Sequence, residues 1–205
     1  MKWITIPEHY LNYLRSAESR IPYSDYGKNH FKPFFGVLFE TDSLLYVTQV
    51  SSTKKRHNKI KKSIDFHKLY DKKDNKLLAV VNLNYMFPVP KELVTDLDYS
   101  KMNEYREFNT PEEKSKYISL LKLEMKLINE LDIGDAARKV YIRKNTFPND
   151  RVSKRCINFR ELEKYALVYQ QIMLSEKQIK ENKTKDAFKV LEELKEKFFN
   201  SSTSS

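Results

Sequence analysis

The sequence predicts an α+β protein, in which an antiparallel sheet comes from the first half of the chain and packed helices come mainly from the second half. Short β-patterned runs separated by turn residues come first, and beyond Asp98 the apolar residues recur at helical spacing. With 205 residues and 40% hydrophobic content, one domain with a substantial core is expected. We place that domain at residues 1–199 and expect a disordered polar tail at residues 200–205.

The first half of the chain contains the runs that we expect to form strands. These are Trp3–Ile6, Phe34–Glu40, Leu44–Val50, Ile64–Tyr70 and Leu77–Leu83. The second and third of them form a predicted hairpin around residues 41–43, and the last is a continuous apolar run, which is typical of a central strand. Pro88 and Pro90 follow. Because proline cannot donate a hydrogen bond to a central ladder, we expect both at an edge or exit of the sheet.

One helix in the second half has clear start signals. Thr110 is the expected N-cap, Pro111 takes the first helical position, and Glu113 is placed to complete a capping box. The apolar stripe of this helix is expected to comprise Tyr117, Leu120, Leu121 and Ile128. Other helices are predicted after Pro7 and at residues 134–145, 158–175 and 185–199.

The net charge limits the kinds of molecule that the protein is expected to bind. A formal charge of +10 attracts polyanions, so RNA, DNA and an anionic membrane are the candidates. A membrane is the weakest of these, because no apolar run approaches the roughly 20 residues that span a bilayer, and the N-terminus has no apolar signal core. A single cysteine, Cys156, allows no internal disulfide, and we expect it to be buried. We therefore expect a cytoplasmic protein that binds nucleic acid.

The sequence predicts neither a cofactor nor a metal. Its three glycines, Gly27, Gly36 and Gly134, lie far apart, and none belongs to a phosphate-binding loop or a dinucleotide fingerprint. The four histidines have no zinc-site spacing; they are His9, His30, His57 and His67. Nucleotide-cofactor chemistry is therefore not expected.

A dense cationic run follows the second hairpin strand. Six of the nine residues from Lys54 to Lys62 are Lys or Arg, and the hydroxyl residues Ser51, Ser52 and Thr53 come directly before them. Such a segment can neutralise a phosphodiester and hold hydroxyl groups against it. Two plainer interpretations stay open, because adjacent serines at a strand end commonly form turns and a charge run is commonly a solvated face.

Four sequence blocks carry a family resemblance. They are KPFFGVLFE (32–40), YVTQVSSTKKRHNKI (46–60), VVNLNYMFPVP (80–90) and CINFRELEKYALVY (156–169). In order and spacing they resemble the ToxN/AbiQ family of type III toxin–antitoxin endoribonucleases, from Met1 to about Tyr169. The resemblance implies a compact, barrel-like antiparallel sheet related to MazF-type toxins. It also implies metal-independent RNA cleavage that serves bacterial growth arrest or abortive phage infection.

The resemblance also implies a set of catalytic residues. They are Ser52, Ser51, Lys54, Lys32 and His57. Metal-free cleavage uses the 2′-hydroxyl of the RNA as nucleophile and leaves a 2′,3′-cyclic phosphate and a 5′-hydroxyl, so the protein must move protons and stabilise a phosphorane-like charge. Ser52 falls on the essential serine of the family, and Lys32 falls on a matched basic position. Which group acts as base and which as acid stays open. His57 is alternatively an ordinary surface histidine.

A larger set of residues is expected to bind RNA. It comprises Tyr26, Lys28, Phe31, Tyr46, Lys55, Arg56, Asn58, Lys59, Lys61 and Lys62. Tyr26 and Phe31 are the expected base-stacking aromatics, whereas Phe34 and Phe35 are expected in the core. Lys28 stands where some relatives have a tyrosine, and Thr53 stands where proline is common.

The expected partners are RNAs. One is a small antitoxin RNA with tandem repeats and a pseudoknot, and the other is a cellular or phage transcript that serves as substrate. Several protein–RNA units could close into a ring or chain. Two functions from other classes stay open: a non-catalytic RNA-binding regulator, and a MazF-like toxin that has a protein antitoxin.

Overall fold

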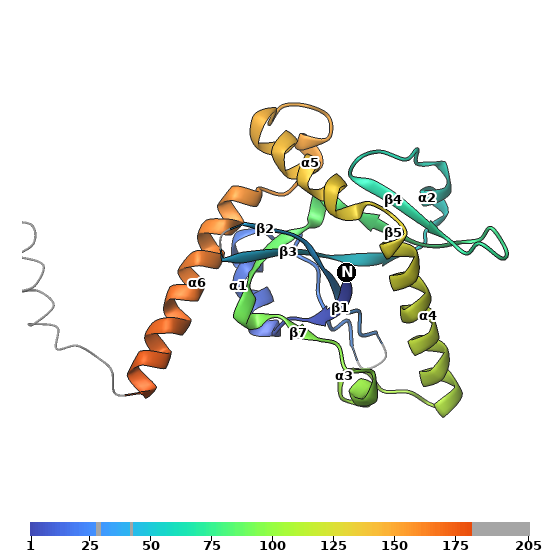
Figure 1. Cartoon of the computed structure of the whole chain (residues 1–205), viewed down its shortest axis with the longest axis horizontal. Helices are drawn as coiled ribbons and strands as arrows, with labels where there is room; N and C mark the ends of the chain where they lie inside the picture. Colours follow the sequence, from blue (N-terminus) through green and yellow to red (C-terminus); the bar gives the residue numbers. More distant parts are fainter. Residues whose placement is uncertain (28–29, 42, 182–205) are drawn as a thin grey trace, which may run out of the picture. The chain divides into compact units, whose positions relative to one another are not determined.

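The computed structural model describes residues 1–27, 30–41 and 43–181 (Figure 1). Their elements confirm the α+β class, with strands in the first half of the chain and the longer helices in the second. The chain divides into one compact unit, Met1–Leu167, and a second that begins at Val168. The predicted helix at residues 185–199 and the predicted tail at residues 200–205 lie outside the described residues.

Seven strands form one antiparallel sheet in the described part of the chain. They are β1 (Lys2–Thr5), β2 (Phe34–Thr41), β3 (Leu44–Ser52), β4 (Phe66–Tyr70), β5 (Leu77–Asn82), β6 (Phe87–Pro90) and β7 (Thr95–Asp96). Their order is β4-β5-β3-β2-β1-β7, and β6 pairs with β3. This path is open between β4 and β7, so barrel-like closure stays a prediction. The β6 pairing places Pro88 and Pro90 on a strand with one described neighbour, as expected for prolines.

The longest strand, β3, has partners on both of its edges. It pairs with β2 along one edge. Along the other, β6 covers its beginning, where Leu44 lies opposite Pro90, and β5 covers its end, where Ser52 lies opposite Ala79. Residues of β3 up to Val50 are buried, as a strand covered on both faces requires. Ser51 and Ser52, which were predicted to follow the strand, are therefore its last two residues, and Thr53 lies beyond it.

The helices confirm most of the predicted ranges. They are α1 (Glu8–Ala17), α2 (Lys55–Lys59), α3 (Met102–Tyr105), α4 (Pro111–Asn129), α5 (Ile133–Thr146) and α6 (Phe159–Lys180). Short 3₁₀ turns are η1 (Leu83–Tyr85), η2 (Lys91–Leu93), η3 (Tyr99–Lys101) and η4 (Ser153–Arg155). The short helix α2 was not predicted, because its charged residues show no apolar spacing. It begins after Lys54, whose carbonyl accepts from the His57 amide at 2.8 Å.

Helix α4 begins as predicted but buries a different stripe. The Thr110 hydroxyl accepts from the Glu113 amide at 3.2 Å, while the Glu113 carboxylate accepts from the Asn109 amide, one residue before the expected position. The prediction that Leu120 is buried was wrong, since it is 40% exposed. Glu124 instead lies in the buried stripe, with Leu121, Leu127 and Ile128.

The core of the first unit packs aromatic rings between the sheet and its helices. Phe34 and Phe35 are fully buried, as predicted, and Phe34 meets Phe87 edge to face at a centroid distance of 5.4 Å. The Tyr10 hydroxyl of α1 donates to the Pro88 carbonyl of β6 at 2.7 Å, so this buried polar group is satisfied.

This buried hydrogen bond gives a test of the fold. We expect Tyr10→Phe to lower the free energy of unfolding by about 1–2 kcal/mol, because it leaves a buried carbonyl without this donor. Urea unfolding measures the change. Tyr70→Phe is the matched control, because the Tyr70 side chain is 40% exposed. An equal effect in the two variants would contradict a structural role for the Tyr10 hydroxyl.

Candidate functional site

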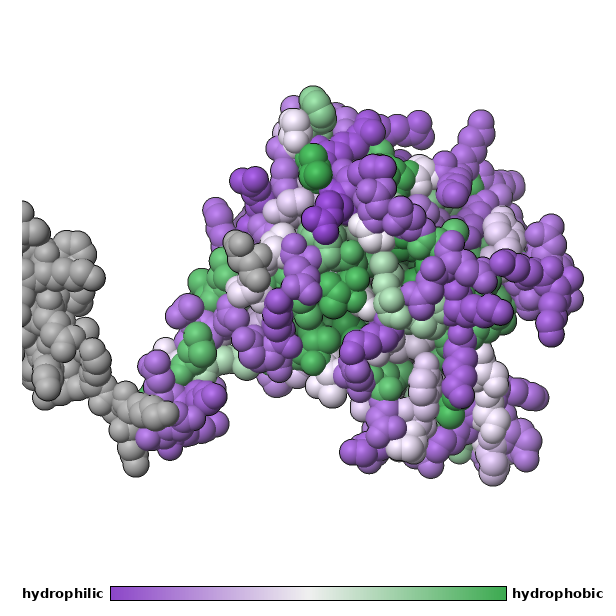
Figure 2. All heavy atoms as spheres, viewed as in Figure 1, coloured by the Kyte–Doolittle hydropathy of each residue, from purple (hydrophilic) through white to green (hydrophobic). Residues whose placement is uncertain are grey.

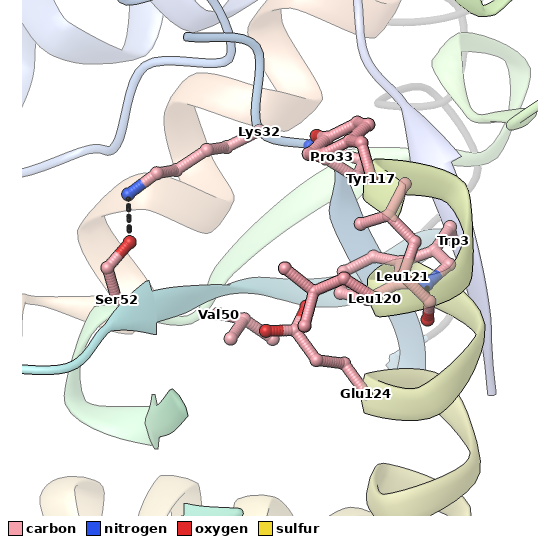
Figure 3. Close-up of a pocket in the computed structure, with 9 residues that line it drawn as sticks. All are labelled: Trp3, Lys32, Pro33, Val50, Ser52, Tyr117, Leu120, Leu121 and Glu124. Carbon is pink, nitrogen blue, oxygen red and sulfur yellow. Dashed lines mark hydrogen bonds between the residues drawn. The ribbon is translucent and has the colours of Figure 1, made fainter. Parts of the chain in front are cut away.

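Two residues from separate sequence blocks meet at the end of β3. Ser52 is the last residue of β3, and Lys32 lies just before β2. Because β2 and β3 are antiparallel neighbours with Phe34 opposite Gln49, the start of β2 lies beside the end of β3. The Lys32 ammonium donates to the Ser52 hydroxyl at 3.0 Å, as Figure 3 shows. The structure therefore joins two of the predicted catalytic residues.

The Lys32 ammonium lies in a partly desolvated and charged setting. Burial lowers its pKa from the usual lysine value, the nearby Glu124 charge opposes that change, and the Lys54 charge adds to it. A lysine with a lowered pKa is better matched to proton transfer near neutral pH. The same ammonium also suits the stabilisation of phosphate charge.

Gln49 holds the segment that carries Lys32 against the sheet. Its side-chain amide donates to the Tyr23 carbonyl at 2.9 Å and to the Lys32 carbonyl at 2.8 Å. The Tyr26 hydroxyl donates to the Gln49 side-chain oxygen at 3.4 Å, and the Lys32 ammonium lies 5.4 Å from the Tyr26 ring centroid. Tyr26 is 48% exposed, so its ring is accessible beside the site. Gln49, a buried polar residue of β3, is a site residue that the sequence prediction missed.

Ser51 does not belong to the Lys32–Ser52 contact. Successive residues of a strand point to opposite faces of a sheet, so Ser51 and Ser52 point apart. The Asn82 side-chain amide donates to the Ser51 hydroxyl at 3.4 Å. Ser51 lines a second cavity, of about 280 Å³, with Tyr26 and Gln49. The two hydroxyls thus open toward different cavities.

A buried carboxylate completes the pocket beside Lys32 and Ser52. Glu124 of α4 is 8% exposed, and its side chain reaches into the pocket (Figure 3). Burial raises its pKa to about 7, and the Lys32 charge partly opposes this rise. Sequence reasoning missed this residue. The available signal was its spacing, because a glutamate three residues after Leu121 falls on the apolar stripe of the helix.

His57 is buried rather than on the surface. It is 4% exposed, its Nδ1 accepts from the Lys54 amide at 3.2 Å, and its ring meets Phe66 edge to face. Burial lowers its pKa first, and the charges of Arg56, Lys54 and Lys68 lower it further. These contacts fix the start of α2. A catalytic role of His57 stays a prediction.

A cleft lined by cations adjoins α2. We call the five side chains Lys55, Arg56, Lys59, Lys61 and Lys62 the cationic surface. All of these except Lys55 line a cleft of about 740 Å³. Arg155 of η4 and Arg151, which comes shortly before η4, also line this cleft. The Arg155 guanidinium binds both carboxylate oxygens of Asp65, at 2.8 and 2.9 Å. Figure 2 shows hydrophilic side chains over the outer end of the β4–β5 hairpin and much of the surface near α2. No spacing in the sequence could have linked residue 151 to this cleft.

Two aromatic residues predicted to bind RNA are buried in the core. Phe31 is 7% exposed and stacks on Tyr105 at a centroid distance of 5.1 Å. Tyr46 is fully buried, and its hydroxyl donates to Glu163 at 2.9 Å. The prediction that Phe31 stacks a base and that Tyr46 contacts RNA was therefore wrong, because core packing already occupies both rings. Lys28 lies outside the described residues.

Cys156 is buried at 4% exposure, as expected. In residues 1–27, 30–41 and 43–181, no three His, Cys, Asp or Glu side chains gather at one place where they could hold a metal ion. In the same residues, no helix has the length and apolar character needed to cross a bilayer.

The sequence comparisons identify the family. The model of the family described as "Toxin ToxN, type III toxin-antitoxin system" matches residues 2–167. The chain belongs to this family. It is 32% identical over 124 residues to the endoribonuclease ToxN of Pectobacterium atrosepticum, over 58% of this chain and 69% of that protein. It is 30% identical over 100 residues to the endoribonuclease ToxN of Bacillus thuringiensis subsp. kurstaki, over 49% of each chain.

Solved structures have a similar fold. One, from work on a processed non-coding RNA that regulates a bacterial antiviral system, has a TM-score of 0.65 at 26% identity and covers 80% of this chain and 97% of its own. AbiQ, a lactococcal anti-phage endoribonuclease of the type III toxin–antitoxin system, has a TM-score of 0.63 at 23% identity, over 83% of this chain and 98% of its own. At that identity, the likeness to AbiQ shows the fold alone.

The buried carboxylate predicts a pH-dependent cost to stability. The pKa of Glu124 is about 7 in the folded chain and near 4.5 ordinarily, so stability falls as pH rises between these values. Since one pKa unit corresponds to about 1.4 kcal/mol, the full cost approaches about 3 kcal/mol above pH 7. We expect Glu124→Gln to unfold at higher urea concentration than the wild type at about pH 8, with little gain at about pH 5. A gain that does not vary with pH would contradict the raised pKa.

Proposed function

We propose that this protein is an endoribonuclease toxin that cleaves RNA without a metal ion. In this proposal the 2′-hydroxyl of the substrate attacks the adjacent phosphate and leaves a 2′,3′-cyclic phosphate and a 5′-hydroxyl. The observation that carries the proposal is the contact between Lys32 and Ser52. Ser52 ends β3, and the cationic surface begins a few residues later in the chain. Family membership and the two endoribonuclease relatives support it.

The residues of the site divide the chemical work. The Lys32 and Lys54 ammonium groups would stabilise charge on the phosphorane-like transition state, and Ser52 would orient the reacting groups or relay a proton. Ser51 would contact the substrate from the neighbouring cavity rather than share the proton transfer of Ser52. His57 would keep α2 in place through its bond to the Lys54 amide, which positions the Lys54 side chain.

We also propose that an RNA antitoxin restrains the enzyme. One structural neighbour comes from work on selective toxin inhibition by a non-coding RNA pseudoknot, and another from work on an antiviral system that a processed non-coding RNA regulates. In this chain the cationic surface and the exposed Tyr26 would bind a repeat-containing pseudoknot RNA. The toxin would act in the cytoplasm, in growth arrest or abortive phage infection, and a barrel-like sheet related to MazF-type toxins is part of the proposal.

The decisive experiment is RNA cleavage in a chelator. Purified wild-type protein at micromolar concentration is incubated with a defined single-stranded RNA in EDTA, and the new ends are identified chemically. We expect cyclic phosphate and 5′-hydroxyl ends. Ser52→Ala should slow single-turnover cleavage by on the order of 100-fold or more, because it deletes the oxygen that Lys32 contacts.

Ser16→Ala is the matched control, because Ser16 lies exposed at the end of α1. It should cleave as the wild type does. Intact RNA with the wild type in EDTA, or full activity of Ser52→Ala, would contradict the proposed chemistry. Tight RNA binding without any cleavage would favour a non-catalytic RNA-binding regulator.

The cationic surface should control RNA affinity and its dependence on salt. Replacing Lys59, Lys61 and Lys62 together by alanine should weaken antitoxin RNA binding and reduce the slope of log affinity against log salt. The expected reduction is about 0.7–0.9 for each lost phosphate contact, because each contact releases condensed counterions. Affinity is measured across a salt series.

Three lysines that form ion pairs make the matched control for this triple variant. Lys2, Lys91 and Lys139 pair with Asp96, Glu40 and Asp135 at 2.6–2.7 Å. Their replacement by alanine changes the net charge by the same amount and should leave most of the salt slope intact. An unchanged slope in the Lys59/Lys61/Lys62 variant would show that these side chains are solvated surface only.

A further inference from the structure

Glu124 is placed where it can act on the Lys32–Ser52 contact. It lies in one pocket with both residues, and Figure 3 shows its carboxyl end extended toward Val50, the residue two positions before Ser52 on β3. The helix that carries it is tied to both neighbouring segments. The Trp3 indole donates to the Leu121 carbonyl at 2.7 Å, and the Tyr117 hydroxyl donates to the Phe31 carbonyl at 2.7 Å. Helix α4 is thus fixed to β1 and to the residue immediately before Lys32.

The burial of this carboxylate is a cost that the fold could avoid. Other residues of the same buried stripe, Leu121, Leu127 and Ile128, are apolar, and leucine or methionine would continue the stripe at residue 124 without a desolvation penalty. A buried ionisable group with a perturbed pKa that opens into a cleft beside reactive side chains is a candidate for function. Here the pocket that it enters is the one with Lys32 and Ser52.

The groups that face Glu124 define what its charge can do. Lys32, from the segment before β2, and Tyr117, from its own helix, line the same pocket as Glu124. The charge of Lys32 favours the carboxylate form of Glu124. Burial and the charge of Lys54 both disfavour the ammonium form of Lys32, and the charge of Glu124 is the one that favours it. Without the Glu124 charge, nothing from this side chain would offset the cost of desolvating the Lys32 ammonium.

We propose that Glu124 is a positioning residue that acts through Lys32: its carboxylate keeps Lys32 in the ammonium form and directed at Ser52 and the phosphate to be cut. This inference rests on the proposed function and deepens it. Glu124 exchanges no atom with the RNA. The 2′-oxygen loses its proton as its bond to phosphorus forms, the 5′-oxygen gains a proton as its bond to phosphorus breaks, and the charged Lys32 stabilises the phosphorane between these events.

The test compares the pH dependence of two rates. Single-turnover cleavage of a defined single-stranded RNA is measured in EDTA, at saturating full-length protein, from about pH 5.5 to about pH 9, for the wild type and Glu124→Gln. The ratio of the two rates removes the effect of pH on the 2′-hydroxyl itself. We expect the wild-type rate divided by the Glu124→Gln rate to be near one at low pH and to rise to on the order of tenfold above about pH 8. The midpoint of this rise should lie at or above pH 7, because bound phosphate opposes ionisation of the carboxyl. RNA affinity should stay within about twofold.

Two further variants make the result specific. Glu104→Gln removes the same charge from an exposed position on α3, and its ratio to the wild type should stay near one at every pH. In a Lys32→Met background, Glu124→Gln should cause no further loss, because the carboxylate acts through the ammonium. Since Glu124→Gln is expected to be the more stable protein at high pH, slower cleavage there cannot come from unfolding.

The outcomes separate this inference from the proposed function. Cleavage by both proteins with a ratio that does not vary with pH would overturn the role of Glu124 alone. A full additional loss in the Lys32→Met background would also overturn it. Intact RNA with the wild type would overturn the proposed function, and the inference with it.

Discussion

The pairing of β3 on both edges is the constraint on which the site depends. This strand pairs with β2 along one edge and with β6 and β5 in succession along the other, so it cannot change register without breaking three pairings. The register with β2 brings Lys32 to Ser52, and the alternation of a strand sends Ser51 to the opposite face. A one-residue slip of β3 would exchange the two serines between the two cavities. The chemistry of the site therefore follows from backbone register as much as from residue type.

The pocket balances opposite charges that the sequence places far apart. The charge of Lys54 disfavours the ammonium form of Lys32, and the charge of Glu124, from a helix some ninety residues later in the chain than Lys32, opposes that effect. Burial makes each of these interactions stronger than on the surface, because less water screens them. Such a site gives up stability for a defined charge state, which a well-packed apolar stripe would not provide. The rigid attachment of α4 through Trp3 and Tyr117 keeps that balance in place.

The fold was more predictable from the sequence than the site was. Alternating and continuous apolar runs located the strands, and Thr110 with Pro111 located the start of α4, because these signals are local. The errors at Phe31 and Tyr46 arose because an aromatic residue suits a core and an RNA surface equally well, and only tertiary packing decides between them. Arg151 reaches the cationic cleft through the fold alone. Glu124 was within reach of sequence reasoning, as a carboxylate on an apolar stripe.

If the protein acts as proposed, it binds RNA and cleaves RNA with different groups of residues. The cationic surface lies on and after α2, whereas the Lys32–Ser52 contact lies at the end of β3, in a pocket that α4 closes. Contacts to phosphates carry little sequence information, so the cationic surface can hold substrate and antitoxin RNA alike. Cleavage needs in addition one phosphate placed at Ser52 with its 2′-oxygen in line. An RNA whose phosphates contact the cationic surface, but which places no phosphate at Ser52 in this geometry, would bind tightly and stay intact. The same cations that recruit a substrate would then hold an inhibitor, and the geometry at Ser52 would decide between the two.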